Sequence, residues 1–210
     1  MSFADKQDNA RGGPSSFQHV GELLAKLRLE WLLEHFSPRL VRAAYVFING
    51  FVTIGLLALL AVITGSPFVF PSLGPTAYLF FFSPLAEAAS PRNTILGHAL
   101  GLICGYAAFA LTTATGPPFG MHAGVYGPRI LAAALSLSAT GALMVLFRVS
   151  HPPAGATTLI VSLGIIAQPK ELVIIEVAVF LLTAQALAIN RLAGLPYPVW
   201  REHNPAGRAS

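Results

Sequence analysis

The residues best suited to chemistry lie in one run, residues 148–158, which reads Arg-Val-Ser-His-Pro-Pro-Ala-Gly-Ala-Thr-Thr. A proline disfavours helical backbone in the residue before it, so we expect extended chain at His151 and a helix that begins after Pro153. The first N–H groups of such a helix have no partner within it, and the helix dipole adds positive potential, which together make an anion site. The candidate substrate-binding residues of this run are Arg148, Ser150, His151, Pro152, Pro153, Gly155, Thr157 and Thr158.

A similar run occurs earlier in the chain. Residues 71–77 read Pro-Ser-Leu-Gly-Pro-Thr-Ala and align without gaps on residues 152–158, so that proline, glycine and threonine coincide at an offset of 81 residues. Gly/Pro-broken segments at matching positions of two halves are typical of the binding site of a transporter. Ser72, Gly74 and Thr76 are therefore further candidates for substrate binding, here without a neighbouring cation.

The composition requires a membrane. Of the 210 residues, 54% are hydrophobic and only 10% charged, against about 25% charged in soluble domains. A soluble enzyme, a nucleic-acid-binding protein and a disordered chain are therefore excluded, although the net charge is +4. The single cysteine, Cys104, excludes an internal disulfide, and the histidines lack the spacing of a metal motif, so we expect neither metal nor cofactor.

The apolar segments that must position these residues predict an all-α polytopic membrane protein. Four segments approach the roughly 20 residues that a membrane crossing needs, and two shorter ones follow the Pro/Gly clusters. The order is long, short, long in each of two halves, residues 43–115 and 128–190. Four and six crossings both stay open, and the distribution of basic residues favours six segments in the bilayer, which would make the halves inverted repeats.

The two ends of the chain are polar and basic. Lysine and arginine residues near both ends place both termini in the cytoplasm, which predicts a multi-pass protein of the cell (inner) membrane. Apolar residues at helical spacing predict an amphipathic helix that lies in the membrane interface, or else packs on a partner. The expected organisation is a disordered tail at 1–16, the amphipathic helix at 17–37, a transmembrane domain at 38–192 and a cytoplasmic tail at 193–210.

Two ionisable residues lie inside the apolar segments. His98 is about one turn into the third segment, and Glu176 is the only acid well inside an apolar run. Such residues indicate function in a membrane, so we consider a proton relay, or an ion pair of Glu176 with His98 or Arg148. The alternatives are a neutral His98 bonded to backbone and an interfacial Glu176.

A stripe of small residues, Gly97, Gly101 and Gly105, occupies one face of the third segment. Small residues allow two helix backbones to approach closely, so the stripe predicts a tight helix contact, within one chain or between copies. Together with the amphipathic helix it favours a homo-oligomer, most simply a dimer.

The chain also resembles the HPP family of integral membrane proteins. Residues 150–157 look like the His-Pro-Pro signature of that family, and residues 83–93 with the Gly-His pair at 97–98 are similar to its Ser-Pro-Leu-Ala-Gln-Pro-Arg-Asn motif. This chain has Glu-Ala-Ala-Ser at 87–90 where the family has a single glutamine. The resemblance covers about residues 38–192.

The resemblance adds Arg92 and Asn93 to the candidates, by position in that motif. Family members from plant plastids and cyanobacteria are associated with nitrite transport, which the resemblance implies here.

The functional interpretation is a transporter or channel for a small inorganic anion, with nitrite as the first candidate. No Ser/His/Asp or paired-carboxylate arrangement indicates an enzyme. A structural or scaffold membrane protein and a small membrane enzyme stay open as alternatives. In the structural alternative, residues 148–158 only cap a helix at the membrane surface, with Arg148 on phospholipid headgroups.

Overall fold

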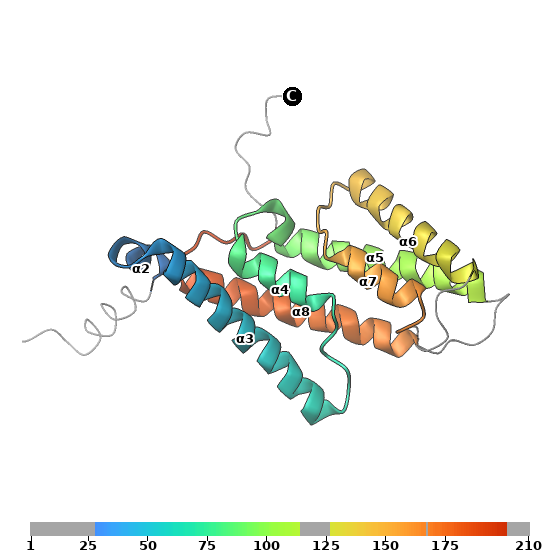
Figure 1. Ribbon diagram of the computed structural model, residues 1–210, viewed down its shortest axis with the longest axis horizontal. Helices are drawn as coiled ribbons and strands as arrows, with labels where there is room; N and C mark the ends of the chain where they lie inside the picture. The colour runs from blue at the N-terminus through green and yellow to red at the C-terminus, as the bar shows by residue number, and fades with distance from the viewer. Residues whose placement is uncertain (1–27, 114–126, 167, 201–210) are drawn as a thin grey trace, which may run out of the picture.

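The computed structural model describes residues 28–113, 127–166 and 168–200, and this part of the chain is helical, without strands (Figure 1). The helices are α2 (Leu29–His35), α3 (Pro38–Thr64), α4 (Leu73–Phe82), η1 (Glu87–Ala89, a 3-10 turn), α5 (Pro91–Thr113), α6 (Gly127–Leu146), α7 (Ala154–Ser162) and α8 (Pro169–Leu192).

Proline and glycine set several helix ends. Helices α3, α5 and α8 each begin with a proline, whose fixed φ suits the first helical position and whose missing N–H would have no partner there. Helix α3 ends at Gly65 with φ 64°, a left-handed conformation that glycine adopts without strain. The side chains of Gln168 and Glu171 form a capping box at the start of α8.

Four helices, α3, α5, α6 and α8, are long and apolar enough to cross a membrane. Helices α4 and α7 have 10 and 9 residues, about 15 Å each, which is half of a hydrocarbon layer of about 30 Å. The predicted all-α membrane fold, with a long, a short and a long segment in each half, is confirmed.

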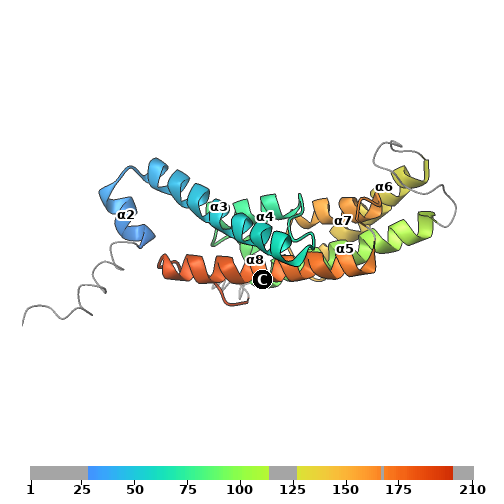
Figure 2. The same cartoon turned by 90° about the horizontal axis from the view of Figure 1, so that it is seen from below.

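Successive helices of the bundle run in opposite directions (Figures 1 and 2). Arg92 at the start of α5 hydrogen-bonds to Phe147 O after the end of α6. Arg129 at the start of α6 reaches Leu163 O at the end of α7. Asn190 at the end of α8 bonds to Phe80 O near the end of α4. Each helix of the set α3–α5 therefore runs opposite to its counterpart in the set α6–α8. The start of α3 and the end of α8 lie on the same side of the bundle (Figure 1).

The glycine stripe of α5 lies against α7. A Cβ added at Gly101 would meet Ala154 O at 2.8 Å, and one at Gly105 would meet Thr158 O at 2.7 Å. A Cβ at Gly97 would come within 2.7 Å of the Cβ of His151. The stripe is thus filled from within the chain, so a dimer would use another face, and the oligomeric state stays a prediction.

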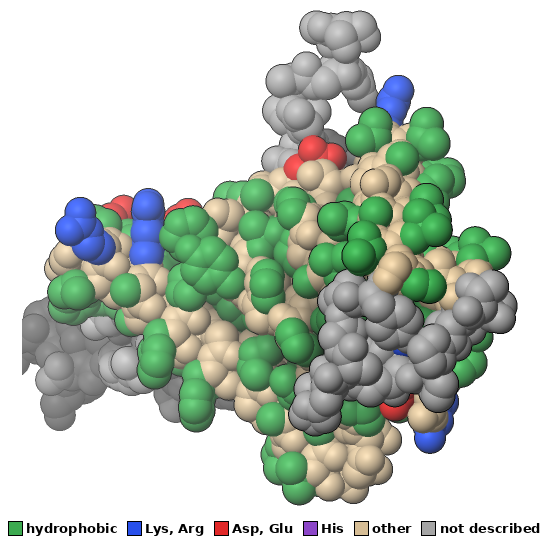
Figure 3. Space-filling view, turned by 45° about the vertical axis from the view of Figure 1, so that its right-hand side comes forward, with side chains coloured by type: hydrophobic (Ala, Val, Ile, Leu, Met, Phe, Trp, Pro, Cys, Tyr) green, Lys and Arg blue, Asp and Glu red, His purple; other side chains and the backbone are tan. Residues whose placement is uncertain are grey.

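The outer surface is apolar between its charged ends, as in a protein that faces lipid. Figure 3 shows hydrophobic side chains over the helices and charged side chains gathered toward their ends. The buried apolar core lies chiefly between α4 and α8, including Phe80 and Leu182, and Val161 of α7 belongs to it as well.

The two terminal regions differ from the expected organisation in detail. Of the amphipathic helix expected at 17–37, the structure has α2, and residues 1–27, including the expected tail, lie outside the described residues. At the other end, residues 193–200 are not a free tail: they return to the bundle, and Tyr197 is completely buried. Residues 201–210 lie outside the described residues.

Candidate functional site

Two histidines meet in the interior of the bundle. His98, two turns into α5, and His151, just before α7, are both fully buried, and their Nε2 atoms are 3.2 Å apart. Their ring centroids are 4.9 Å apart with the planes tilted by 56°, so the rings meet at their edges rather than stack. Because Gly97 has no side chain, α5 can approach the Cβ of His151 closely enough to bring the two imidazoles together.

The two threonines that align in the repeated runs hold the two nitrogens of one imidazole. Thr76 Oγ1, from α4, is 3.0 Å from His98 Nε2. Thr157 Oγ1, from α7, is 2.7 Å from His98 Nδ1. Both threonines are almost completely buried. The short helices of the two halves therefore converge on His98 near the start of each helix.

The carbonyl of Ala88 fixes the proton of neutral His151. His151 Nδ1 must donate to Ala88 O at 2.7 Å, because a carbonyl oxygen only accepts. A neutral imidazole carries one N–H, so His151 Nε2 is an acceptor, and two groups lie 3.2 Å from it, His98 Nε2 and the Thr76 hydroxyl. When His98 Nε2 donates, His98 Nδ1 accepts from the Thr157 hydroxyl; when the Thr76 hydroxyl donates, His98 Nδ1 carries the proton and donates to Thr157. Two proton arrangements therefore fit these contacts.

The expectation that the first backbone N–H groups of α7 are free is wrong. The N–H groups of Ala154, Gly155 and Ala156 donate to the carbonyls of His151, Pro152 and Pro153, respectively. Pro153 itself is helical, with φ −56° and ψ −25°, so a 3-10 turn precedes α7 and uses the donors that the sequence had left free. In α4 the N–H of Leu73 is likewise bonded, to Phe70 O.

A tight turn and an arginine position His151. Arg148 has φ 52°, a left-handed conformation uncommon for a residue with a side chain, and it ends α6. Arg92 donates to the carbonyls of Phe147 at 3.0 Å and Arg148 at 2.8 Å, which have no partners within the helix. Asn93, in turn, accepts a hydrogen bond from Arg92 and donates to Glu87 O.

The family model "HPP, transmembrane region" matches residues 35–198. These residues include both histidines, both threonines and Arg92. The chain belongs to the HPP family. No curated protein and no solved structure matches it significantly.

The signature of this HPP chain contributes fewer binding groups than the sequence indicated. Arg148, Ser150 and Pro152 are exposed, and Pro153 is half-buried. Gly155 faces Leu137 of α6, with 3.4 Å between an added Cβ and the Leu137 side chain.

The other candidates lie around the histidine pair or away from it. Thr158 is buried and receives a hydrogen bond from Thr140. Gly74 is exposed and open. Ser72 is buried, and its hydroxyl has no partner among the described residues.

Glu176 forms no ion pair with His98 or Arg148. Its two carboxylate oxygens are buried and have no hydrogen-bond partner among the described residues. A buried polar group that has no hydrogen-bond partner is costly in an apolar setting, so Glu176 stays a candidate for function. Among the described residues of this HPP protein, no three His, Cys, Asp or Glu side chains form a group that could hold a metal.

One set of contacts that supports His151 was not predicted from the sequence. At residues 87–90 the family motif has one glutamine, and here the first three of these residues form η1. The Ala88 carbonyl of η1 accepts from His151, and its Ala89 carbonyl accepts from the hydroxyl of Tyr197. Burial raises the pKa of Tyr197, so this hydroxyl stays a donor. The N–H of Arg92 also bonds to Trp200 O. The one sequence feature that could have indicated these contacts is the presence of Tyr197 and Trp200 in an otherwise polar terminal segment.

Proposed function

We propose that this protein transports a small inorganic anion together with a proton, and that the His98–His151 pair is the central site. Nitrite is the first candidate substrate, because HPP family members from plant plastids and cyanobacteria are associated with nitrite transport. The observation that carries the proposal is that Thr76 and Thr157, from two half-length helices, hydrogen-bond to the two ring nitrogens of the buried His98. A purely structural histidine would not need matching residues from both halves.

A proton is needed because the neutral pair offers an anion little attraction. Moving an uncompensated charge into an apolar interior costs far more than a few neutral hydrogen bonds return. In the arrangement with the proton of His98 on Nε2, an added proton goes to Nδ1, and the Thr157 hydroxyl 2.7 Å away rotates to accept it. The site then carries one positive charge that can balance one small anion.

The groups available to the anion suit transport rather than tight binding. The Ser72 hydroxyl, which has no partner within the described segments, lies one helical turn before Thr76, whose own hydroxyl bonds to Ser72 O. Hydroxyls and a singly charged imidazolium bind more weakly than an arginine fork, and a transporter needs binding that permits release. The exposed Arg148 has no place in this site.

The opposite senses of α3–α5 and α6–α8 support an inverted repeat. In transporters with such repeats, the halves rock around a site at their interface and expose it alternately to each side. The histidine pair has this position, because α4 and α7 belong to different halves and both contact it. We place both termini on the cytoplasmic side of the cell membrane, as the basic residues at both ends indicate.

The test is anion uptake into proteoliposomes, with nitrite, nitrate, formate and chloride, at several pH gradients. We expect one of the anions to enter faster when the outside is more acidic. Thr157→Ser keeps the hydroxyl and should retain uptake, whereas Thr157→Val should lower it at least tenfold.

Thr183→Val is the matched control. Thr183 is a buried threonine of α8 whose hydroxyl bonds only to its own helix, at Val179 O. Wild-type uptake by Thr157→Val, or no flux of any anion above protein-free liposomes, would contradict the proposal and favour the scaffold alternative.

A further inference from the structure

A second site lies far from the histidines, in a groove between α3 and the end of α8. Its volume is about 1140 Å³, above the roughly 300–1,000 Å³ of most small-molecule pockets. In Figure 2, α3 slants away from α8 toward its N-terminus and α2 lies at the open end. The apolar lining includes Leu40, Ala44 and Ile48 from α3 and Ile189 and Leu192 from α8.

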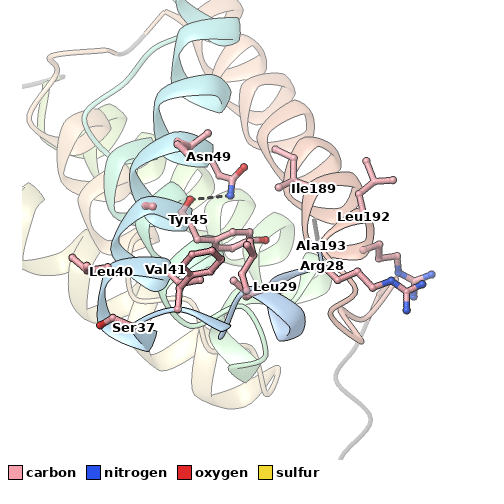
Figure 4. A pocket seen from close by; sticks show the side chains of 15 residues that line it. Arg28, Leu29, Ser37, Leu40, Val41, Tyr45, Asn49, Ile189, Leu192 and Ala193 are labelled. Carbon is pink, nitrogen blue, oxygen red and sulfur yellow. Dashed lines mark hydrogen bonds between the residues drawn. The ribbon is translucent and has the colours of Figure 1, made fainter. Parts of the chain in front are cut away.

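Two polar side chains of the groove are bonded within the protein. The Tyr45 hydroxyl donates to Asn190 Oδ1 at 2.7 Å. The Asn49 amide nitrogen donates to Tyr45 O at 2.8 Å, the dashed line in Figure 4. The walls therefore offer contact to a hydrocarbon chain and little to an inorganic anion.

Two arginines lie at one end of the groove. The aliphatic part of Arg28 packs near Gly194, within 3.3 Å of where a Cβ on that glycine would be. Arg191 Nε donates to Tyr197 O at 3.0 Å, and its two terminal nitrogens have no hydrogen-bond partner in the described part of the chain. Both arginines are exposed and line the groove. Figure 4 shows Arg28 beside Ala193, directed away from the apolar wall.

We propose that this groove binds an anionic phospholipid from the leaflet on the side of both chain ends. One acyl chain lies between α3 and α8, and the phosphate contacts Arg28 and Arg191. The charge at the end and the apolar walls together match a negatively charged amphiphile, and α3 already faces the bilayer. Helix α2 is already bonded to the end of α8, from Leu29 N to Ala193 O. The lipid would add a contact between α3 and α8 beside this bond.

The experiment is native mass spectrometry of the full chain in detergent, with phosphatidylglycerol or phosphatidylcholine of identical acyl chains. The wild type should bind one phosphatidylglycerol and prefer it. In the double variant Arg28→Gln/Arg191→Gln this preference should fall about 30-fold. Each arginine contributes about 1 kcal/mol to the binding of an anionic lipid, and the variant removes two. Arg39→Gln/Arg42→Gln, on the same side but outside the groove lining, is the matched control and should keep it.

A second variant tests the acyl-chain site. Ala44→Phe fills the groove from the exposed side of α3 and should reduce binding of both lipids. Equal binding of the two lipids by the wild type, or unchanged preference in the double arginine variant, would overturn the proposal. So would a lipid-free dimer that Ala44→Phe dissociates, because a second copy would then occupy the groove.

Discussion

Replacing Gly101 by alanine tests how closely α5 and α7 must pack to bring His98 to Thr157. The added Cβ would lie 2.8 Å from Ala154 O, whereas ordinary contact begins at 3.4 Å. The opposing atom belongs to the backbone and cannot rotate away, so the helices must separate by about half an ångström. Overpacking of this kind costs about 1–3 kcal/mol.

The measurement is thermal unfolding in detergent, paired with uptake. For a chain of this size the cost lowers Tm by about 2–12 °C, taking about 2–4 °C per kcal/mol. Uptake should fall as well, because the 2.7 Å contact between His98 and Thr157 spans the same interface. Gly141→Ala is the control: nothing lies within 4 Å of the new Cβ, so Tm should hold or rise. Equal Tm values for the two variants would refute the packing argument.

Two further predictions concern the support of His151. Tyr197→Phe should lower the free energy of unfolding by about 1 kcal/mol, because the buried Ala89 carbonyl loses its donor. The control Tyr78→Phe, at an exposed position, should leave the free energy of unfolding unchanged. Because burial raises the pKa of Tyr197, its contribution should be constant below about pH 10 and decline as pH rises further, measured as wild-type minus variant stability. Arg92→Lys should reduce uptake with little loss of expression, because an ammonium cannot reproduce the fork that holds two carbonyls, whereas uptake by Arg148→Gln should equal that of the wild type.

The side chains at the centre of the site could be found from sequence. His151 and Thr157 stand in a motif, Thr76 aligns with Thr157 in the other half, and His98 is an ionisable residue inside an apolar segment. Such positions carry information because a membrane interior penalises polar residues that have no partner.

The backbone contributions could not be found in the same way. Whether the first N–H groups of α7 were free depended on the conformation of Pro153, which the preference of X-Pro sequences leaves undecided. The Ala88 and Ala89 carbonyls leave no mark in the sequence, and Tyr197 reaches Ala89 across 108 residues. Of the roles considered for Glu176, the ion pair with His98 or Arg148 does not occur, because burial alone does not say which neighbour a side chain meets.

The most direct test of the histidine pair as a proton-coupled anion site is to record nitrite uptake and internal pH together in one proteoliposome sample. With the outside more acidic, the wild type should take up nitrite and acidify the interior in step, beyond the leak of protein-free liposomes. His98→Gln, which can hydrogen-bond but cannot hold the extra proton, should show neither. Nitrite entry without acidification, or coupled entry at the wild-type rate in His98→Gln, would contradict the account.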